Sequence, residues 1–178
     1  MRVQRFGEHR AMPWANGLGT SYEVASDRNV DGVWTWRVAI APVVLDGPFS
    51  VMPGVDRALV VIEGNGMVLN IDDESVKCMP GQVVRFSGDS TTFARLVGGP
   101  VVDLGLMTVR DSVIGSMVVV ADVGDVVDSD VLVAIGDAVF EDEQGRQYRL
   151  GSRDVLLGVR GYPLVLLGGT AIAIKVNS

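Results

Sequence analysis

WTWRVAIAPVVLDGPFSVMPGVDRALVVIEGNGMVL, from Trp34 to Leu69, sets the strand pattern of this chain and raises its main functional question. Two runs rich in apolar and β-branched residues each carry one arginine, and the Pro/Gly-rich segment DGPFSVMPG joins them. Such runs predict buried strands, and the segment between them predicts a loop. An unpaired charge away from water is costly. Arg37 and Arg57 are therefore expected to meet either an acidic side chain or an anionic ligand.

The same kind of run recurs along the whole chain, about every 8–12 residues, between Gly, Pro and Asp residues, as in sandwiches and barrels. The segments Gly7–Gly19 and Leu45–Val55 lack it and predict long loops. LVVIEG, beginning at Leu59, resembles LVAIG, beginning at Leu132, which indicates a duplicated unit. The sequence predicts an all-β bicupin with two small antiparallel jelly-roll barrels, residues 1–111 and a degenerate copy at 112–178, in one compact chain.

Composition and charge limit the classes of function. The chain has 178 residues, 48% of them hydrophobic, yet no apolar run reaches the roughly 18 residues of a membrane helix. The first ten residues, MRVQRFGEHR, lack a signal-peptide core, so a soluble cytoplasmic protein is expected. A net charge of -7 argues against binding to nucleic acid or acidic membranes. The lone Cys78 excludes an internal disulfide and is expected to be buried, whereas His9, the only histidine, is expected in an exposed loop.

Period-two alternation places Arg37, Ala39 and Ala41 on one face of a strand, and Arg57 shares a face with Leu59. The small side chains beside Arg37 leave room for a ligand. Internal salt bridges are the alternative, because buried charges are usually paired within the protein. The available acidic partners are Glu23, Asp56, Glu63 and Asp103.

The spacing around Gly64 resembles the first motif of the cupin barrel, Gly-x5-His-x-His-x3–4-Glu-x6-Gly. This resemblance places Arg57 where the metal-binding Glu stands. The histidine positions fall on Ser50 and Met52, or Val51 and Pro53, and that of the second motif on Thr92. Because all four customary ligands are absent, neither a metal ion nor another cofactor is expected. An arginine in place of a carboxylate favours an anion-binding pocket.

MPWANGLGTSYEVA, at Met12–Ala25, resembles the signature of the HutD/Ves family, which is close to MPWKNGGGxTREIA. WRVAIAPV, DGPFSVMPGVDRALVVIEGNGMVL, RFSGD and GPVVDLGLM follow in the order of that family. Departures are Ala15 where Lys is usual, Leu18 in place of Gly, and Ser21-Tyr22 in place of Thr-Arg. The resemblance implies a small bicupin linked to histidine utilisation, which binds a small acidic metabolite, with a histidine-degradation intermediate as one candidate.

The predicted ligand contacts are Arg57, Arg37 and Asn16, whose amide can orient a carboxyl or amide group. Trp14 either walls the pocket or fastens its loop to the barrel. Glu23 either accepts a hydrogen bond from a ligand amine or neutralises Arg57. Phe49 either caps the barrel mouth or fills its core. No catalytic residue is predicted.

Two rival functions stay open. One is a metal-free cupin enzyme, isomerase-like, which acts on a small acid or sugar with Glu23 or Tyr22 as acid/base. The other is a non-catalytic module that binds a protein through the acidic second half, where residues 111–143 hold nine acidic residues and no Lys or Arg. Edge strands could also pair into a homodimer.

Overall fold

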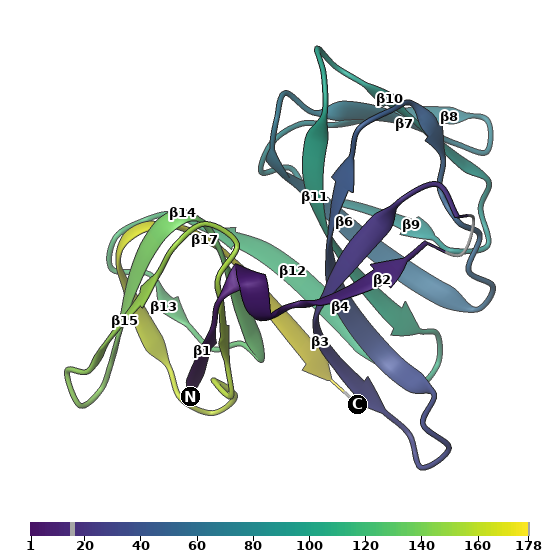
Figure 1. Cartoon of the computed structure of the whole chain (residues 1–178). Coiled ribbons are helices and arrows are strands. Elements are labelled where there is room, and N and C mark those ends of the chain that lie inside the picture. Colours follow the sequence, from purple (N-terminus) through teal and green to yellow (C-terminus); the bar gives the residue numbers. More distant parts are fainter. Residues whose placement is uncertain (15–16, 178) are drawn as a thin grey trace. The chain divides into compact units, whose positions relative to one another are not determined.

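The computed structural model describes residues 1–14 and 17–177, and nearly all of its regular structure is β-strand (Figure 1). Among these residues the only helical element is the 3-10 turn η1, Phe6–Glu8. The prediction of an all-β chain is therefore confirmed. No helical segment in the described ranges has the length and apolar character needed to cross a membrane.

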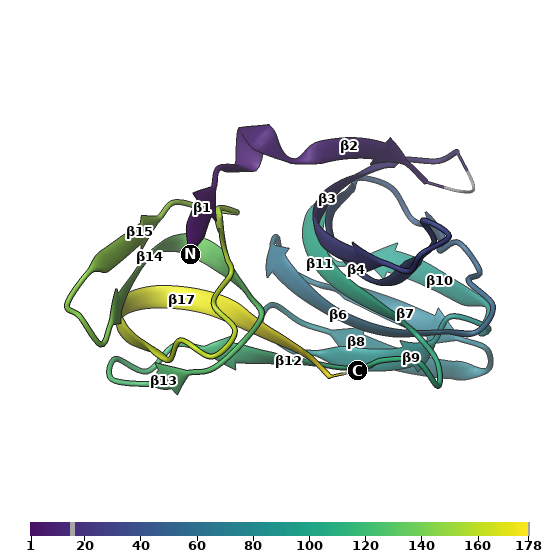
Figure 2. The same cartoon turned by 90° about the horizontal axis from the view of Figure 1, so that it is seen from below.

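The larger of two structural units covers Arg10–Ile114 and holds two antiparallel sheets. The first sheet has the strand order β2 (Arg10–Pro13), β3 (Thr20–Arg28), β4 (Trp34–Val43), β11 (Val101–Val109), β6 (Val55–Glu63), β9 (Val84–Ser87). The second has the order β5 (Gly47–Pro48), β10 (Thr92–Leu96), β7 (Met67–Ile71), β8 (Glu74–Cys78). β4 pairs with β3 on one side and with β11 on the other, and Figure 2 shows these three strands in the same part of the larger unit. A core cluster joins the two sheets, with Leu59 and Val61 from β6 packed with Met67 and Leu69 from β7.

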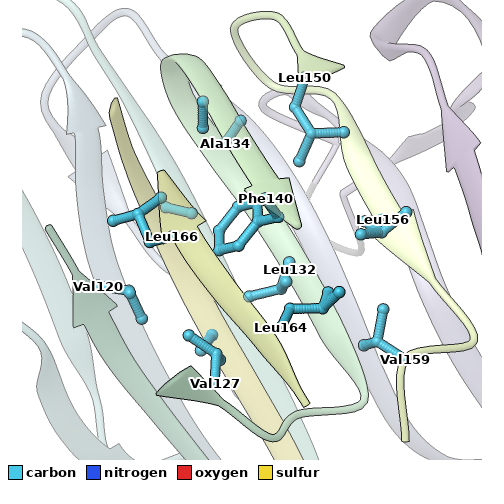
Figure 3. Packing of buried hydrophobic residues seen from close by; sticks show 13 residues of the cluster. Val120, Val127, Leu132, Ala134, Phe140, Leu150, Leu156, Val159, Leu164 and Leu166 are labelled. Carbon is cyan, nitrogen blue, oxygen red and sulfur yellow. The ribbon is translucent and has the colours of Figure 1, made fainter. Parts of the chain in front are cut away.

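The smaller unit combines Met1–His9 with Gly115–Asn177. Its sheet has the order β1 (Arg2–Gln4), β16 (Val155–Leu157), β14 (Val131–Asp142), β17 (Leu164–Asn177), β12 (Ile114–Val120), while β13 (Val126–Val127) pairs with β17 and β15 (Gln147–Leu150) with β14. Phe140 lies within its core cluster, among Leu132, Leu164 and Leu166 (Figure 3). The antiparallel pairing of Arg2 with Leu157 makes the start of the chain a strand of this sheet.

All three strand orders have two ends, so these sheets are open and do not close on themselves. The division of the chain into two small jelly-roll barrels, a bicupin, stays a prediction.

Two predicted loops contain short elements. The Gly7–Gly19 segment includes part of η1 and the whole of β2, and Leu45–Val55 includes β5. β2 pairs with β3 through Arg10 with Glu23 and Met12 with Ser21. β2 has only four residues and ends in a proline, so the run is too short to show a clear alternation, which explains why the pattern missed it.

The expectation of an exposed His9 is wrong, because His9 is 7% exposed. Its Nε2 lies 3.2 Å from the backbone oxygen of Arg153, and its ring meets that of Phe6 edge-on, with centroids 5.6 Å apart. Since a carbonyl oxygen only accepts, Nε2 carries the proton in this contact. His9 is thus a structural residue of the smaller unit.

Gly169 faces a register shift in β14, where pairing passes from Ile135 to Ala138. Its φ is +87°, and a Cβ there would overlap the backbone oxygen of Asp137. Gly169→Ala is expected to lower the free energy of unfolding by about 2 kcal/mol or more, because strain in the left-handed region adds to the clash. Urea unfolding followed by far-UV circular dichroism measures this loss.

The neighbouring Gly168 provides a matched control, because a Cβ there meets nothing within 4 Å. Gly168→Ala is expected to change the free energy of unfolding by less than about 0.5 kcal/mol. Equal losses in the two variants would contradict this account of Gly169 and the register shift opposite it.

Candidate functional site

The larger unit contains a cavity of about 240 Å³. Its floor consists of β4, β11 and β6, three consecutive inner strands of the first sheet. Its rim comes from β2 and the residue after it, from β3 and from the loop before β6, with the residues Pro13, Trp14, Ser21, Phe49, Ser50 and Met52. The cavity therefore lies where the sequence predicts the two arginine-bearing strands and the Pro/Gly-rich loop.

Cross-strand pairing arranges the floor in three rows. Directly paired residues point to the same face of a sheet, so each row presents its side chains together. The rows are Arg37–Met107–Arg57, then Ala39–Gly105–Leu59, then Ala41–Asp103–Val61. The middle row is low because Gly105 has no side chain and Ala39 a short one. The predicted face of Arg37, Ala39 and Ala41 is confirmed as a cavity wall.

Arg57 is partly buried, and its guanidinium group contributes to the cavity wall. Its Nη1 donates a hydrogen bond of 3.2 Å to the backbone oxygen of Ser50. The rings of Phe49 and Phe86 lie 5.2 and 5.0 Å from its guanidinium carbon. Burial lowers the pKa of Arg57, the charge of Asp103 raises it and that of Arg37 lowers it. The group stays protonated because an arginine starts from so high a value.

Arg37 lines the same cavity, and not all of its N–H groups have hydrogen-bond partners within the part of the chain that the structure describes. Its Nη2 is 3.4 Å from the sulfur of Met107, and its guanidinium carbon is 5.3 Å from the ring of Trp34. Its Nε is buried and has no hydrogen-bond partner among the described residues. Burial lowers the pKa of Arg37, the charge of Glu23 raises it and that of Arg28 lowers it.

The acidic side chains proposed as partners are engaged or placed elsewhere. Asp56 lies 2.8 Å from Arg110, and Glu23 lies 3.7 Å from Arg28. Glu63 is not among the residues that line the cavity. Asp103 lines it, but no ion pair within 4 Å joins it to an arginine in the described part of the chain. Internal salt bridges therefore do not account for Arg37 and Arg57.

Asp103 is the cavity residue that sequence reasoning considered only as a salt-bridge partner. It is 5% exposed and follows a register shift between β11 and β6, at Val102/Asp103. Such bulges re-aim side chains beside functional sites. Burial raises the pKa of the Asp103 carboxyl to about 7, although the charge of Arg57 acts to lower it. The available signal was its alternation with Gly105 and Met107 on one strand face.

Trp14 and Phe49 both line the cavity. Trp14 also fastens its loop, because its backbone nitrogen donates to the oxygen of Gly19 at 2.9 Å and a Cβ on Gly19 would lie 2.9 Å from the indole. Phe49 packs against Phe86, with ring centroids 6.5 Å apart. Trp14 thus both walls the cavity and fastens its loop, whereas Phe49 lines the cavity and packs against the core cluster of the larger unit.

The two other predicted contacts are not part of this cavity wall as the structure describes it. Glu23 is not among the lining residues, and besides Arg28 it accepts a hydrogen bond from Ser26 at 3.3 Å. Its charge reaches the site through Arg37 rather than by neutralising Arg57. Asn16 lies outside the described residues.

The donor set does not fit a divalent cation. Ser50, Met52 and Arg57, which the cupin motif places at metal-ligand positions, all line the cavity. Thr92, the fourth position, is buried, and its hydroxyl donates to the oxygen of Ser90 at 3.5 Å. Within residues 1–14 and 17–177, no three His, Cys, Asp or Glu side chains gather as a metal site would require. Two guanidinium groups in one cavity repel a cation and attract an anion.

Comparisons with known proteins identify the family of this chain and agree with its fold. An uncharacterised 21.2 kDa protein from the hutC 3′ region of Pseudomonas putida is 34% identical over 110 residues, which cover 60% of this chain and 57% of that protein. The chain thus spans little more than half the length of the curated relatives it matches.

The solved structure of HutD from Pseudomonas fluorescens SBW25 is similar over 99% of both chains, with 27% identity and a TM-score of 0.81. A Cupin 2 conserved barrel domain protein from Leptotrichia buccalis shares the fold, with a TM-score of 0.60 and 11% identity over 99% of this chain and 96% of the other. The HutD family model matches residues 7–173, which confirms the resemblance seen in the sequence. The chain belongs to the HutD family.

Proposed function

We propose that this chain binds a small anionic metabolite, without a metal ion, in the cavity of the larger unit. The observation that carries the proposal is the pair of guanidinium groups, Arg37 and Arg57, which face one cavity and lack an ion-pair partner among the described residues. Arginine matches a carboxylate in bidentate geometry, and charge-assisted hydrogen bonds strengthen where water is excluded. The low middle row leaves space for a compact ligand in about 240 Å³.

The family suggests which anions to test first. A relative lies in the hutC 3′ region, which links the family to a histidine utilisation locus. Histidine degradation passes through small carboxylic acids, so urocanate and N-formylglutamate are the first candidates. Both present carboxylates of a size that suits the cavity.

Isothermal titration calorimetry with N-formylglutamate and urocanate tests the proposal. Removing one partner of a buried charged pair costs about 2–5 kcal/mol, so Arg57→Ala is expected to weaken binding by about 30-fold or more. Arg95→Ala is the matched control, because Arg95 is exposed on β10 and does not line the cavity. Unchanged affinity in Arg57→Ala would remove Arg57 from the site.

A second variant tests the cavity without changing any charge. A Cβ on Gly105 would meet only the backbone oxygen of Ala39, at 4.0 Å, and the backbone of Gly105 needs no positive φ. Gly105→Val should therefore fold and fill the low middle row. Binding that survives this filling would place the ligand elsewhere.

A metal-free enzyme is the second candidate function, and Asp103 is the observation that favours it. A carboxyl with a pKa of about 7 inside a cavity suits general acid/base chemistry. Tyr22, one of the acid/base residues expected from the sequence, lines a separate cavity of about 320 Å³. Exchange of ligand C–H protons with deuterium, followed by NMR in wild type and Asp103→Asn, tests this candidate.

We also propose that the two units are cupin-type halves, with the ligand-binding barrel formed by the first half of the chain. LVAIG lies in β14, and LVVIEG lies in β6 except for its final glycine, which follows the strand; both are inner strands of their sheets. Fold likeness to a cupin barrel protein along nearly the whole chain supports the same interpretation.

A further inference from the structure

We propose that Asp103 is a further ligand contact. Its side chain, as a neutral carboxylic acid, donates a hydrogen bond to the bound anion, so that binding takes up one proton from solvent. This inference rests on the anion-binding function proposed above. It assigns the role of Asp103 and the protonation state in which that role is carried out.

The position of Asp103 brings it to the ligand. It lies on β11, the strand between the two that carry Arg37 and Arg57, and it lines the same cavity. Although Asp103 is 5% exposed, no hydrogen bond or ion pair reaches its carboxyl group within the described residues. A buried carboxylate without a partner is costly, whereas a carboxylic acid has an O–H to donate.

The charged and titratable groups around Asp103 come from three neighbouring strands. Arg57 on β6 acts on it directly, and Arg37 on β4 acts on Arg57. Cys78 on β8 also senses the charge of Asp103, and burial raises the pKa of this thiol to about 11, so it stays neutral near pH 7. The residues of the site thus carry two guanidinium charges and one carboxyl group that can take either form near pH 7.

A bound carboxylate changes this balance. Two carboxylates that share a site cannot both ionise easily, so the pKa of one of them rises. The ligand carboxylate is held by the arginines, and the proton therefore binds to Asp103. The O–H of Asp103 then donates a charge-assisted hydrogen bond to the ligand oxygen. No other group gains or loses a proton in this step.

Calorimetric titration of the wild-type chain with N-formylglutamate, in two buffers with different ionisation enthalpies, measures the proton uptake. The ligand carboxyls, with pKa values near 4, stay ionised from pH 6 to pH 9. We expect uptake close to one proton at pH 8 and close to zero at pH 6, where Asp103 is already protonated. Affinity should fall by up to about tenfold per pH unit above pH 7.

Two variants distinguish the effect of the titrating proton on binding from the effect of the hydrogen bond. Asp103→Asn keeps an N–H donor and cannot titrate, so it should bind with no proton uptake and no fall in affinity between pH 7 and pH 9. Asp103→Ala lacks the donor and should bind more weakly than Asp103→Asn at every pH.

The outcomes distinguish this inference from the proposed function. Wild-type binding without proton uptake at pH 8, or uptake that persists in Asp103→Asn, would overturn the role of Asp103 and leave anion binding intact. Failure of the wild type to bind at both pH 6 and pH 8 would overturn the anion-binding function, and this inference with it.

Discussion

Between pH 4 and pH 8 the wild type should lose about 4 kcal/mol of its free energy of unfolding, and Asp103→Asn should not show this loss. The reason is that folding raises the pKa of the Asp103 carboxyl from 3.8 to about 7. The folded state binds this proton more tightly than the unfolded state does. The stabilisation is therefore fully present below the pKa of the unfolded state, 3.8, and is lost as pH rises through the pKa of the folded state, about 7. Asparagine has no proton to lose.

Urea unfolding at several pH values from 4 to 8 measures the effect as a difference between the two proteins. Other titrating groups are common to both, so their contributions cancel. Asp89→Asn is a control with the opposite sign, because hydrogen bonds from Gly54, Ser87 and Arg110 hold the pKa of Asp89 at about 2. This lowered pKa adds stability that is present above pH 4 and lost as pH falls from about 4 to about 2, so the Asp89→Asn control is measured in that more acidic range. Parallel pH profiles for wild type and Asp103→Asn would show that Asp103 titrates normally.

Phe140→Ala is expected to lower the free energy of unfolding by about 3–5 kcal/mol, the usual cost of removing a large buried aromatic side chain. Phe140 is 0% exposed, and its neighbours come from three strands of the smaller unit, with Leu132 on the same strand, Leu156 on β16 and Leu164 on β17 (Figure 3). Strands paired on both sides cannot collapse readily into the space left by the ring. The cavity that remains adds to the lost hydrophobic burial.

Phe93→Ala is the matched control, because Phe93 is 38% exposed on β10 and should lose about 1 kcal/mol or less. Far-UV circular dichroism follows strands of both units. All three tryptophans, Trp14, Trp34 and Trp36, belong to the larger unit, so their fluorescence follows that unit alone. A dichroism transition that Phe140→Ala leaves in place would contradict the central position of this ring in the core.

Local sequence pattern predicted much of the site. Alternation is a property of single strands, so it placed Arg37 with Ala39 and Ala41, and Arg57 with Leu59, on the cavity face. The family resemblance drew attention to the segments that hold Trp14 and Phe49, and both line the cavity.

What the sequence missed depends on pairing between distant segments. Alternation along the strand groups Asp103 with Gly105 and Met107, but the pairing of β11 with both β4 and β6, which brings this face into the cavity, is not encoded locally. Glu23 was expected near Arg57, but its strand pairs with β4, which brings it toward Arg37 and Arg28. The burial of His9 cannot be predicted locally, because its partner Arg153 is far away in the sequence.

The pairing of β1 with β16 has a consequence for biosynthesis. Residues 2–4 are synthesised before residues 10–114, but their partners at 155–157 are made only after the larger unit has been translated. The opening segment must therefore wait, solvated and without a strand partner, while residues 10–114 can already collapse. The order of synthesis thus favours a nascent chain in which the larger unit, with its cavity, folds first and the sheet of β1, β16, β14 and β17 is completed last.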